Sequence, residues 1–247
     1  RYNLPLMCGV GTGTIADSLA ALKKVVYEDG TLLLTELVAA MQNNFEGQER
    51  LRQLLINRVP KWGNGDDYVD SLAHQVVELF IDELEKHRNQ QGERYSANMI
   101  PTTTHIFFGD LTGATPDGRL AHAPQSDGIS PTHGMDKKGP TAVLSSMSRL
   151  DHERCSGTLL NMKFHPSALS SEGDMSRFSN LIRTYFKLGG HHMQFNVLSG
   201  ETLRAAQENP EEYKHLIVRV AGYSDYFIRL SKDTQDEIIS RTEYGAV

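Results

Sequence analysis

The stretch that most constrains this chain is residues 216–230, which read LIVRVAGYSDYFIRL. Two apolar runs flank a group of small residues at 221–224. Glycine adopts positive φ without a Cβ clash, so Gly222 between the two runs indicates a tight turn. We therefore predict a strand that ends near Val220, a turn at Gly222 and a return strand through Tyr226.

The composition narrows the class of protein. The chain has 247 residues, 39% hydrophobic and 23% charged, which suffices for a sizeable core and one or two domains. Its net charge is −6 without a Lys/Arg cluster, so we expect no nucleic-acid partner and no anionic membrane surface. No apolar run approaches the roughly 20 residues of a membrane span.

The start of the chain and its cysteines bear on compartment and completeness. Residues 1–13 lack the charged-then-apolar order of a signal peptide, and the chain has no initiator Met, so we expect a processed or excised piece. Cys8 and Cys155 are too few for a disulfide scaffold and indicate a reducing, cytoplasmic location.

Apolar residues at helical spacing predict helices in the first half of the chain. Thr14 is the predicted N-cap of the first helix, and Trp62 is a predicted packing anchor in a Gly-rich turn. The expected inward face of the first helix is Ile15, Leu19, Leu22 and Val26, and that of the long fourth helix is Val69, Leu72, Val76, Leu79, Phe80 and Leu84. The predicted helices cover residues 14–28, 35–47, 48–58 and 66–89.

Strands alternate with helices in the second half, which predicts an α/β architecture with parallel strands. We expect strands at 102–109, 157–165 and 191–198, where β-branched, aromatic and apolar residues gather. Ser199 and Ser231 are expected helix N-caps. The remaining predicted elements are helices at 173–188, 199–209 and 231–243, and loops at 113–119, 127–131 and 138–142.

His192, Gln194 and Asn196 share one face of the strand at 191–198, because side chains alternate along a strand. This face either lines a substrate pocket or satisfies the polar groups of neighbouring loops, and the sequence favours neither. His191 and His192 point to opposite faces, so we expect no metal site.

Two other patterns are weaker candidates for a functional site. The glycines at 9–13 lack the spacing of a dinucleotide loop and follow no clear strand. Ser130, His133 and Asp136 are close in sequence, but we expect a loop of turn-forming residues there, since a catalytic triad requires a geometry that sequence proximity does not supply.

The residues RVAGYS at 219–224 resemble the glycyl-radical loop of the glycyl radical enzymes, near the C-terminus where that family carries it. A radical at Cα is delocalised over the two adjacent amides and needs a planar Cα, which only glycine provides without a hindering side chain. Further stretches share the resemblance, and their sequences are most similar to the diol-dehydratase, choline-lyase and hydroxyproline-dehydratase branch. These stretches are residues 13–30, 62–73, 113–144, 157–166, 189–213 and 230–243.

The resemblance implies the C-terminal half of a ten-stranded α/β barrel surrounded by helices. It implies a barrel part at 1–198 and a glycyl radical domain at 199–247, with Gly222 at a buried loop tip. The expected half-barrel strands lie near 102–109, 158–165 and 191–198 and lead into the glycine loop, and the chain should not close a barrel alone.

The family places its thiyl cysteine in a Gly-Cys-x-Glu loop, which neither Cys8 nor Cys155 matches. The resemblance therefore implies that another part, either a separate subunit or a preceding segment, carries that loop. Gly222 is the implied radical residue, supported by Arg219, Ala221, Tyr223 and Ser224. The chain would need no permanently bound cofactor or metal, because an activating enzyme with an iron–sulfur cluster and S-adenosylmethionine installs the radical.

The implied activity is elimination from a small polar substrate, either dehydration or C–N or C–S cleavage, in a complete enzyme expected to be a homodimer. One alternative is C–C cleavage of the formate C-acetyltransferase kind. Others are a non-catalytic spare-part subunit that replaces a damaged glycine domain, and an inactive remnant. The spare-part alternative is weaker, because such subunits resemble only the last stretch. The sequence does not identify the substrate.

Overall fold

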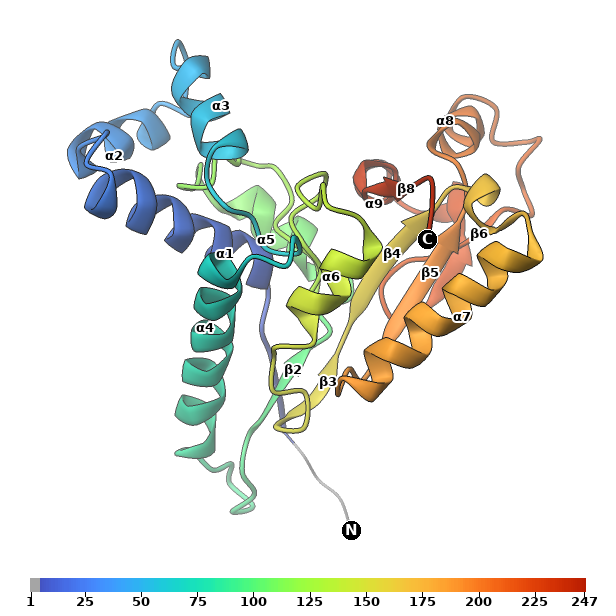
Figure 1. The fold of residues 1–247 in the computed structure, drawn as a ribbon, viewed down its shortest axis with the longest axis horizontal. Helices are drawn as coiled ribbons and strands as arrows, with labels where there is room; N and C mark the ends of the chain where they lie inside the picture. Colours follow the sequence, from blue (N-terminus) through green and yellow to red (C-terminus); the bar gives the residue numbers. More distant parts are fainter. Residues whose placement is uncertain (1–4) are drawn as a thin grey trace.

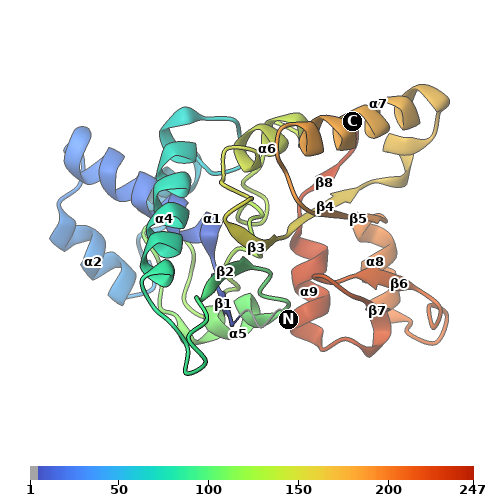
Figure 2. The same ribbon diagram turned by 90° about the horizontal axis from the view of Figure 1, so that it is seen from below.

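The computed structural model describes residues 5–247 and is shown in Figures 1 and 2. Its strands are β1 (Leu6–Cys8), β2 (Ser96–Met99), β3 (Cys155–Thr158), β4 (Leu160–Phe164), β5 (Met193–Val197), β6 (Ile217–Arg219), β7 (Ser224–Tyr226) and β8 (Glu243–Tyr244). Its helices are α1 (Thr12–Ala21), continued by the π-helix η1 (Leu22–Glu28), α2 (Leu34–Gln42), α3 (Glu49–Asn57), α4 (Asp67–Glu85), α5 (Thr104–Leu111), α6 (Pro140–Met147), the 3₁₀ helix η2 (Pro166–Leu169), α7 (Glu172–Lys187), α8 (Gly200–Glu208), the 3₁₀ helix η3 (Phe227–Arg229) and α9 (Lys232–Ser240).

Parallel strands and the helices between them form an α/β fold, as the sequence predicted. One sheet has the order β1-β2-β3 and another the order β5-β4-β8, with parallel pairing in both. Leu159 separates β3 from β4, so the predicted strand at 157–165 is divided between the two sheets. Within residues 5–247 no sheet closes into a barrel.

The predicted strand at 102–109 is wrong, because these residues form helix α5. The true strand, β2, lies just before it and ends ahead of Pro101, which has no N–H to donate to a ladder. The Thr104 N–H donates to the carbonyl of Pro101 and opens the helix instead. Strand propensity reflects packing on a pleated surface, and Phe107 and Phe108 are both exposed rather than packed in a sheet.

The helices of the first half lie close to their predicted positions. Asp66 caps α4 by accepting from the Tyr68 N–H at 3.0 Å. The cap of α1 is a correction, because Gly11 in a left-handed conformation stands before Thr12 and Thr14 lies inside the helix. The inward faces were also partly wrong, since α1 buries its alanines and α4 buries a row displaced from the predicted one. Exposed members of the predicted faces are Ile15 and Leu79, and the buried residues are Ala16, Ala20, Val69, Ala73, Val77 and Ile81.

In the second half, α7, α8 and α9 lie where helices were predicted, and Ser171, Ser199 and Ser231 cap them. Helix α6 is an additional element that begins inside the predicted loop at 138–142. Pro140 stands at its first turn, where the missing N–H is not needed and φ is already helical. The Gly139-Pro140 pair, which by sequence indicated a break, is instead the start of a helix.

The core has two parts. The larger apolar cluster joins the first helices to both parallel sheets, and Trp62 is fully buried in it with its Nε1–H donating to the carbonyl of Ile129 at 2.9 Å. The smaller cluster lies between α8, α9 and the β6–β7 hairpin. Its buried members are Leu203, Ala206, Val218, Val220, Phe227 and Ile238.

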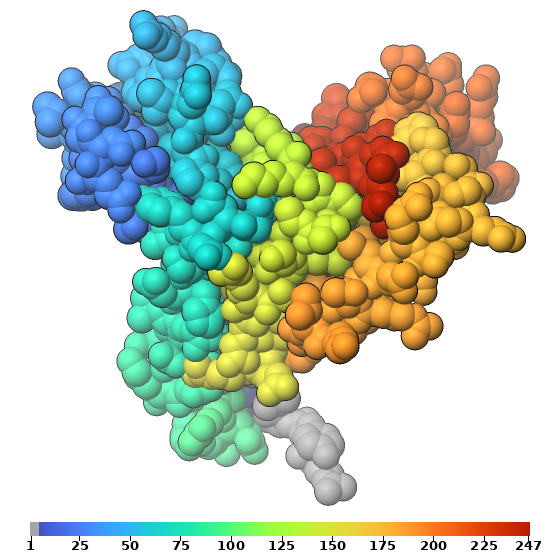
Figure 3. Space-filling view, viewed as in Figure 1, coloured from blue at the N-terminus to red at the C-terminus, as the bar shows by residue number. Residues whose placement is uncertain are grey.

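The outline of the molecule has two arms. Figure 2 shows the β6–β7 hairpin beside α8 and α9, at the end of the molecule opposite α2. Figure 3 shows a broad recess between the arm of α2 and α3 and the arm of α8 and α9. Across residues 5–247, every helix is too short or too polar to cross a bilayer.

Candidate functional site: the glycine loop

Gly222 lies at the tip of the predicted hairpin. Strands β6 and β7 are antiparallel with Arg219 opposite Ser224, and the Val220 N–H donates to the Tyr223 carbonyl at 2.9 Å to close the turn. Gly222 has φ +82°, in the left-handed region that favours glycine. The sequence therefore placed the strands and the turn correctly.

The predicted burial of this tip is wrong for the chain as described. Gly222 and Tyr223 are exposed, whereas Ala221 is fully buried beneath them. A Cβ at Gly222 would meet one atom within 4 Å, Cγ2 of Ile100 at 3.6 Å. Residues 5–247 thus cover the loop from one side only, and its outer face is open.

Strand β5 holds the backbone of this loop through two buried amide side chains. Oε1 of Gln194 accepts the Gly222 N–H at 3.0 Å, and its Nε2 donates to the Val220 carbonyl at 3.3 Å. Asn196 accepts the Arg219 N–H at 2.8 Å and donates to the Arg219 carbonyl at 2.7 Å. The sequence left two roles open for this face, lining a substrate pocket and bonding the polar groups of a neighbouring loop. The hydrogen bonds of Gln194 and Asn196 correspond to the second role.

Arg219 and Ser224 close the base of the hairpin with their side chains. Arg219 Nε donates to Gln194 Oε1 at 3.2 Å, and its guanidinium donates to Ser224 Oγ at 3.2 Å. Tyr223 points outward, and partial burial together with Asp225 raises the pKa of its hydroxyl. The predicted support residues Arg219, Ala221, Tyr223 and Ser224 therefore lie around the glycine in the hairpin.

His192 differs from its predicted neighbours. It stands just before β5 and is half-buried, and its carbonyl accepts the Leu160 N–H at 3.4 Å. Desolvation and the nearby positive charge of Arg219 lower the pKa of its imidazole, so it is neutral at physiological pH. Its place in a pocket remains a prediction.

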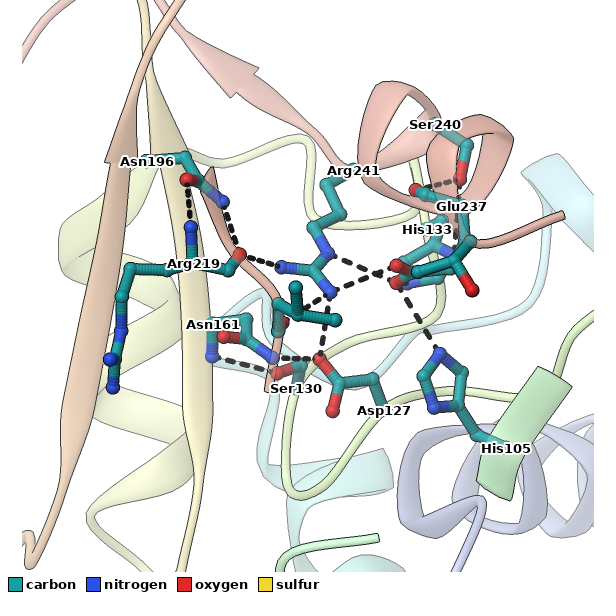
Figure 4. A network of polar contacts seen from close by, with 12 residues as sticks. His105, Asp127, Ser130, His133, Asn161, Asn196, Arg219, Glu237, Ser240 and Arg241 are labelled. Carbon is teal, nitrogen blue, oxygen red and sulfur yellow. Dashed lines mark hydrogen bonds and ion pairs between the residues drawn. The ribbon is translucent and has the colours of Figure 1, made fainter. Parts of the chain in front are cut away.

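A buried ionic cluster, which no local sequence pattern predicted, lies behind the loop (Figure 4). The Arg241 guanidinium donates to the Val220 carbonyl at 2.7 Å and to Glu237 Oε2 at 2.8 Å. Nε2 of His105 and Nε2 of His133 lie 3.4 and 3.1 Å from Glu237 Oε1. Loop residues, helix α5 and helix α9 thus converge on one fully buried carboxylate.

The cluster sets the charge of Glu237. Burial raises the pKa of this carboxyl, but Arg241 and the two histidines outweigh burial and hold the pKa well below its ordinary value. The carboxylate is therefore ionised and binds Arg241, which in turn holds the loop carbonyls. The i, i+4 spacing of Glu237 and Arg241 was the one local sign of this pair, while the histidines lie more than 100 residues away in sequence.

The other predicted sites take structural roles. Ser130 Oγ accepts the Asn161 N–H at 3.0 Å, and Asp136 accepts from the hydroxyls of Thr242 and Tyr244, so the three residues at 130–136 form no triad. Cys8 is exposed, and Cys155 is buried with its thiol pKa raised by desolvation to about 11. That thiol is protonated at neutral pH.

Two family models match this chain. A pyruvate formate lyase-like model matches residues 1–109, and a glycine radical model matches residues 125–228, which include the hairpin and Gly222. The chain belongs to the glycyl radical enzymes. In this family the radical is a modification of the polypeptide rather than a bound cofactor.

Curated glycyl radical enzymes align with nearly the whole chain. It is 47% identical over 243 residues to trans-4-hydroxy-L-proline dehydratase of Clostridioides difficile, covering 98% of this chain and 31% of that protein. It is 41% identical to isethionate sulfite-lyase of Oleidesulfovibrio alaskensis, covering 96% of this chain and 29% of the relative. The chain thus spans about a third of the length of these relatives.

Solved structures agree. The B12-independent glycerol dehydratase of Clostridium butyricum in its glycerol-bound form superposes with a TM-score of 0.96 at 46% identity, covering 99% of this chain and 31% of that one. Hydroxyproline dehydratase of Clostridioides difficile, with trans-4-hydroxy-L-proline bound, superposes with a TM-score of 0.97 at 46% identity, with the same coverage.

Proposed function

We propose that this chain is the C-terminal part of an oxygen-sensitive glycyl radical enzyme that eliminates water, an amine or a sulfur group from a small polar substrate. The observation that carries the proposal is Gly222. It stands at positive φ at the tip of a braced hairpin, inside the segment matched by the glycine radical model.

The proposed chemistry proceeds through transfers of single hydrogen atoms and one expulsion of a leaving group. An activating enzyme with an iron–sulfur cluster and S-adenosylmethionine removes a hydrogen atom from Cα of Gly222. The resulting radical takes a hydrogen atom from a cysteine thiol outside this chain, which restores glycine and leaves a thiyl radical. The thiyl radical then takes a hydrogen atom from the substrate, and the substrate radical expels its leaving group. The product radical finally takes the hydrogen atom back from the cysteine thiol, which regenerates the thiyl radical.

The missing part would supply the cysteine loop and the cover over Gly222. Its absence accounts for the exposed face of the loop and for the open sheets within residues 5–247. We propose accordingly that these sheets are half of a ten-stranded barrel, and that the complete enzyme is a homodimer. The separate apolar cluster of α8, α9 and the hairpin supports a glycyl radical domain at 199–247 beside a barrel part at 1–198.

Elimination is favoured over C–C cleavage by the names of the most similar relatives. Relatives at 40–47% identity include dehydratases and sulfite-lyases, whereas the indoleacetate decarboxylase of Tractidigestivibacter scatoligenes is 38% identical. A spare-part subunit is disfavoured because those relatives align with 94–98% of the chain and not only with its last stretch.

The test is anaerobic activation of the complete enzyme, followed by electron paramagnetic resonance. A doublet from the remaining α-hydrogen of Gly222 is expected only with activating enzyme and S-adenosylmethionine. Brief exposure to air should then cut the chain at Gly222, and mass spectrometry of the denatured protein should detect a C-terminal fragment that begins near Tyr223. An activated enzyme with no doublet that survives air uncut would refute the radical role.

A further inference from the structure

The side-chain amide of Gln194 is bonded on every side, although it lies beneath a loop whose tip is open. Oε1 accepts from two donors, the Gly222 N–H at 3.0 Å and Arg219 Nε at 3.2 Å. Nε2 donates to the Val220 carbonyl at 3.3 Å and to Oδ1 of Asn161. With 5% of its surface exposed, Gln194 is a rigid acceptor for the glycine amide.

The orientation of this amide is fixed by groups that have only one hydrogen-bonding role. A guanidinium N–H can only donate, so the atom that faces Arg219 must be Oε1. A peptide carbonyl can only accept, so the atom that faces Val220 must be Nε2. This series of hydrogen bonds continues to Asp127, because Asn161 Nδ2 donates to its fully buried carboxyl group. A flipped Gln194 would set its NH₂ group against both the Gly222 N–H and Arg219.

We propose that Gln194 is a positioning residue for the glycyl radical, an inference that rests on the proposed function of Gly222. A Cα radical is stabilised only while both flanking amides are coplanar with it. Glycine at an open tip has the widest backbone freedom of any residue. The hydrogen bond to Oε1 fixes the amide plane on the N-terminal side of Gly222 and increases electron donation from its nitrogen toward the radical carbon.

Asn196 provides a matched control from the same face of the same strand. It is as deeply buried as Gln194, and it holds the loop through the N–H and carbonyl of Arg219 at 2.8 and 2.7 Å. The interactions of Asn196 are with Arg219 and not with the Gly222 amide. Removal of its amide therefore loosens the hairpin without altering the hydrogen bond to the radical residue.

The experiment compares native enzyme, Gln194→Met and Asn196→Leu, each as the complete activated enzyme in H₂O and in D₂O. Electron–nuclear double resonance measures the coupling of the exchangeable Gly222 amide hydrogen. We expect Gln194→Met to shift this coupling and to shorten the anaerobic half-life of the radical roughly fivefold, the factor for one lost hydrogen bond of about 1 kcal/mol. Asn196→Leu should keep the native coupling.

A native coupling in Gln194→Met, or the same shift in both variants, would overturn the role of Gln194. If Gln194→Met fails to fold or to form a radical, a measurement on the native enzyme alone tests the proposal. The quadrupole coupling of its amide deuteron should report an N–H···O bond of ordinary length, and the value of an unbonded amide would refute the proposal. A native enzyme without any glycine signal would instead refute the radical role of Gly222, on which this inference depends.

Discussion

Replacement of Gly222 by alanine should separate the chemical role of this residue from its structural role. The new Cβ would meet only Cγ2 of Ile100 at 3.6 Å, an ordinary contact, so no steric clash adds to the energy. The remaining term is the left-handed conformation, φ +82°, which costs a residue with a side chain about 1–2 kcal/mol. For a cooperative unit of roughly 150–250 residues, 1 kcal/mol lowers Tm by about 2–4 °C.

Gly189 supplies the matched control for this substitution. It follows α7 with φ +97°, and a Cβ added there would meet no other described residue within 4 Å beyond its chain neighbours. Gly189→Ala should therefore destabilise the protein by a similar amount, because it carries the same backbone strain at an exposed position. It lies outside the loop that we propose carries the radical.

The assay is spin quantitation by electron paramagnetic resonance after anaerobic activation, together with a thermal melt of each protein before activation. Both variants should melt slightly below the native enzyme. Gly189→Ala should give the native doublet and the native cut in air, whereas Gly222→Ala should give neither. A glycine-type doublet in Gly222→Ala, or an equal loss of signal in both variants, would contradict the reasoning.

Three further predictions concern buried groups. Glu237→Gln removes the nearest carboxylate from the buried Arg241 charge and leaves Asp127, 3.9 Å away, so α9 and the hairpin should lose up to about 3–5 kcal/mol of protection in hydrogen exchange. Burial raises the pKa of Asp17 to about 7, so the folded protein binds a proton that the unfolded chain releases near pH 4. The contribution of Asp17 to stability should therefore fall between about pH 4 and pH 7 by on the order of 4 kcal/mol, and melts of Asp17→Asn, which keeps an oxygen for the Trp62 N–H, should lack this contribution. The Tyr185 hydroxyl is buried without a partner among the described residues, so Tyr185→Phe should leave the unfolding free energy unchanged or raise it by about 1 kcal/mol. A decrease of the unfolding free energy by more than about 1 kcal/mol would contradict this prediction.

Local patterns in the sequence were sufficient for most helices and for the glycine hairpin. Cap residues such as Ser199 and Ser231 act within one turn of their own position, so the sequence states them directly. The hairpin likewise depends on neighbours, because a glycine between two apolar runs specifies both the turn and its strands. The segment at 102–109 failed for the opposite reason. Its β-branched and aromatic residues suit a strand, but Pro101 and the packing of α5 near α9 decide the outcome.

The candidate site was predictable only in part. Gly222 and Arg219 were identified by their motif, and Gln194 and Asn196 by the alternation of one strand. Their bonds to the loop were not readable, since strand β5 and the hairpin are more than 20 residues apart in sequence. The contacts of Glu237 with His105 and His133 were missed, because contacts across more than 100 residues leave no local pattern.

The last strand has a consequence for a chain that oxygen has cut at Gly222. Strand β8 pairs in parallel with β4, Tyr244 is packed into the larger core, and Lys163 Nζ donates to the Ile239 carbonyl at 2.7 Å. The severed piece from Tyr223 onward would stay in place as a bound peptide, so the native mass of the damaged enzyme would not change. Replacement of the severed piece by an intact one would first require strand β8 to dissociate from β4. The cleavage would therefore not be detected by gel filtration of the native protein, and it would be detected only after denaturation.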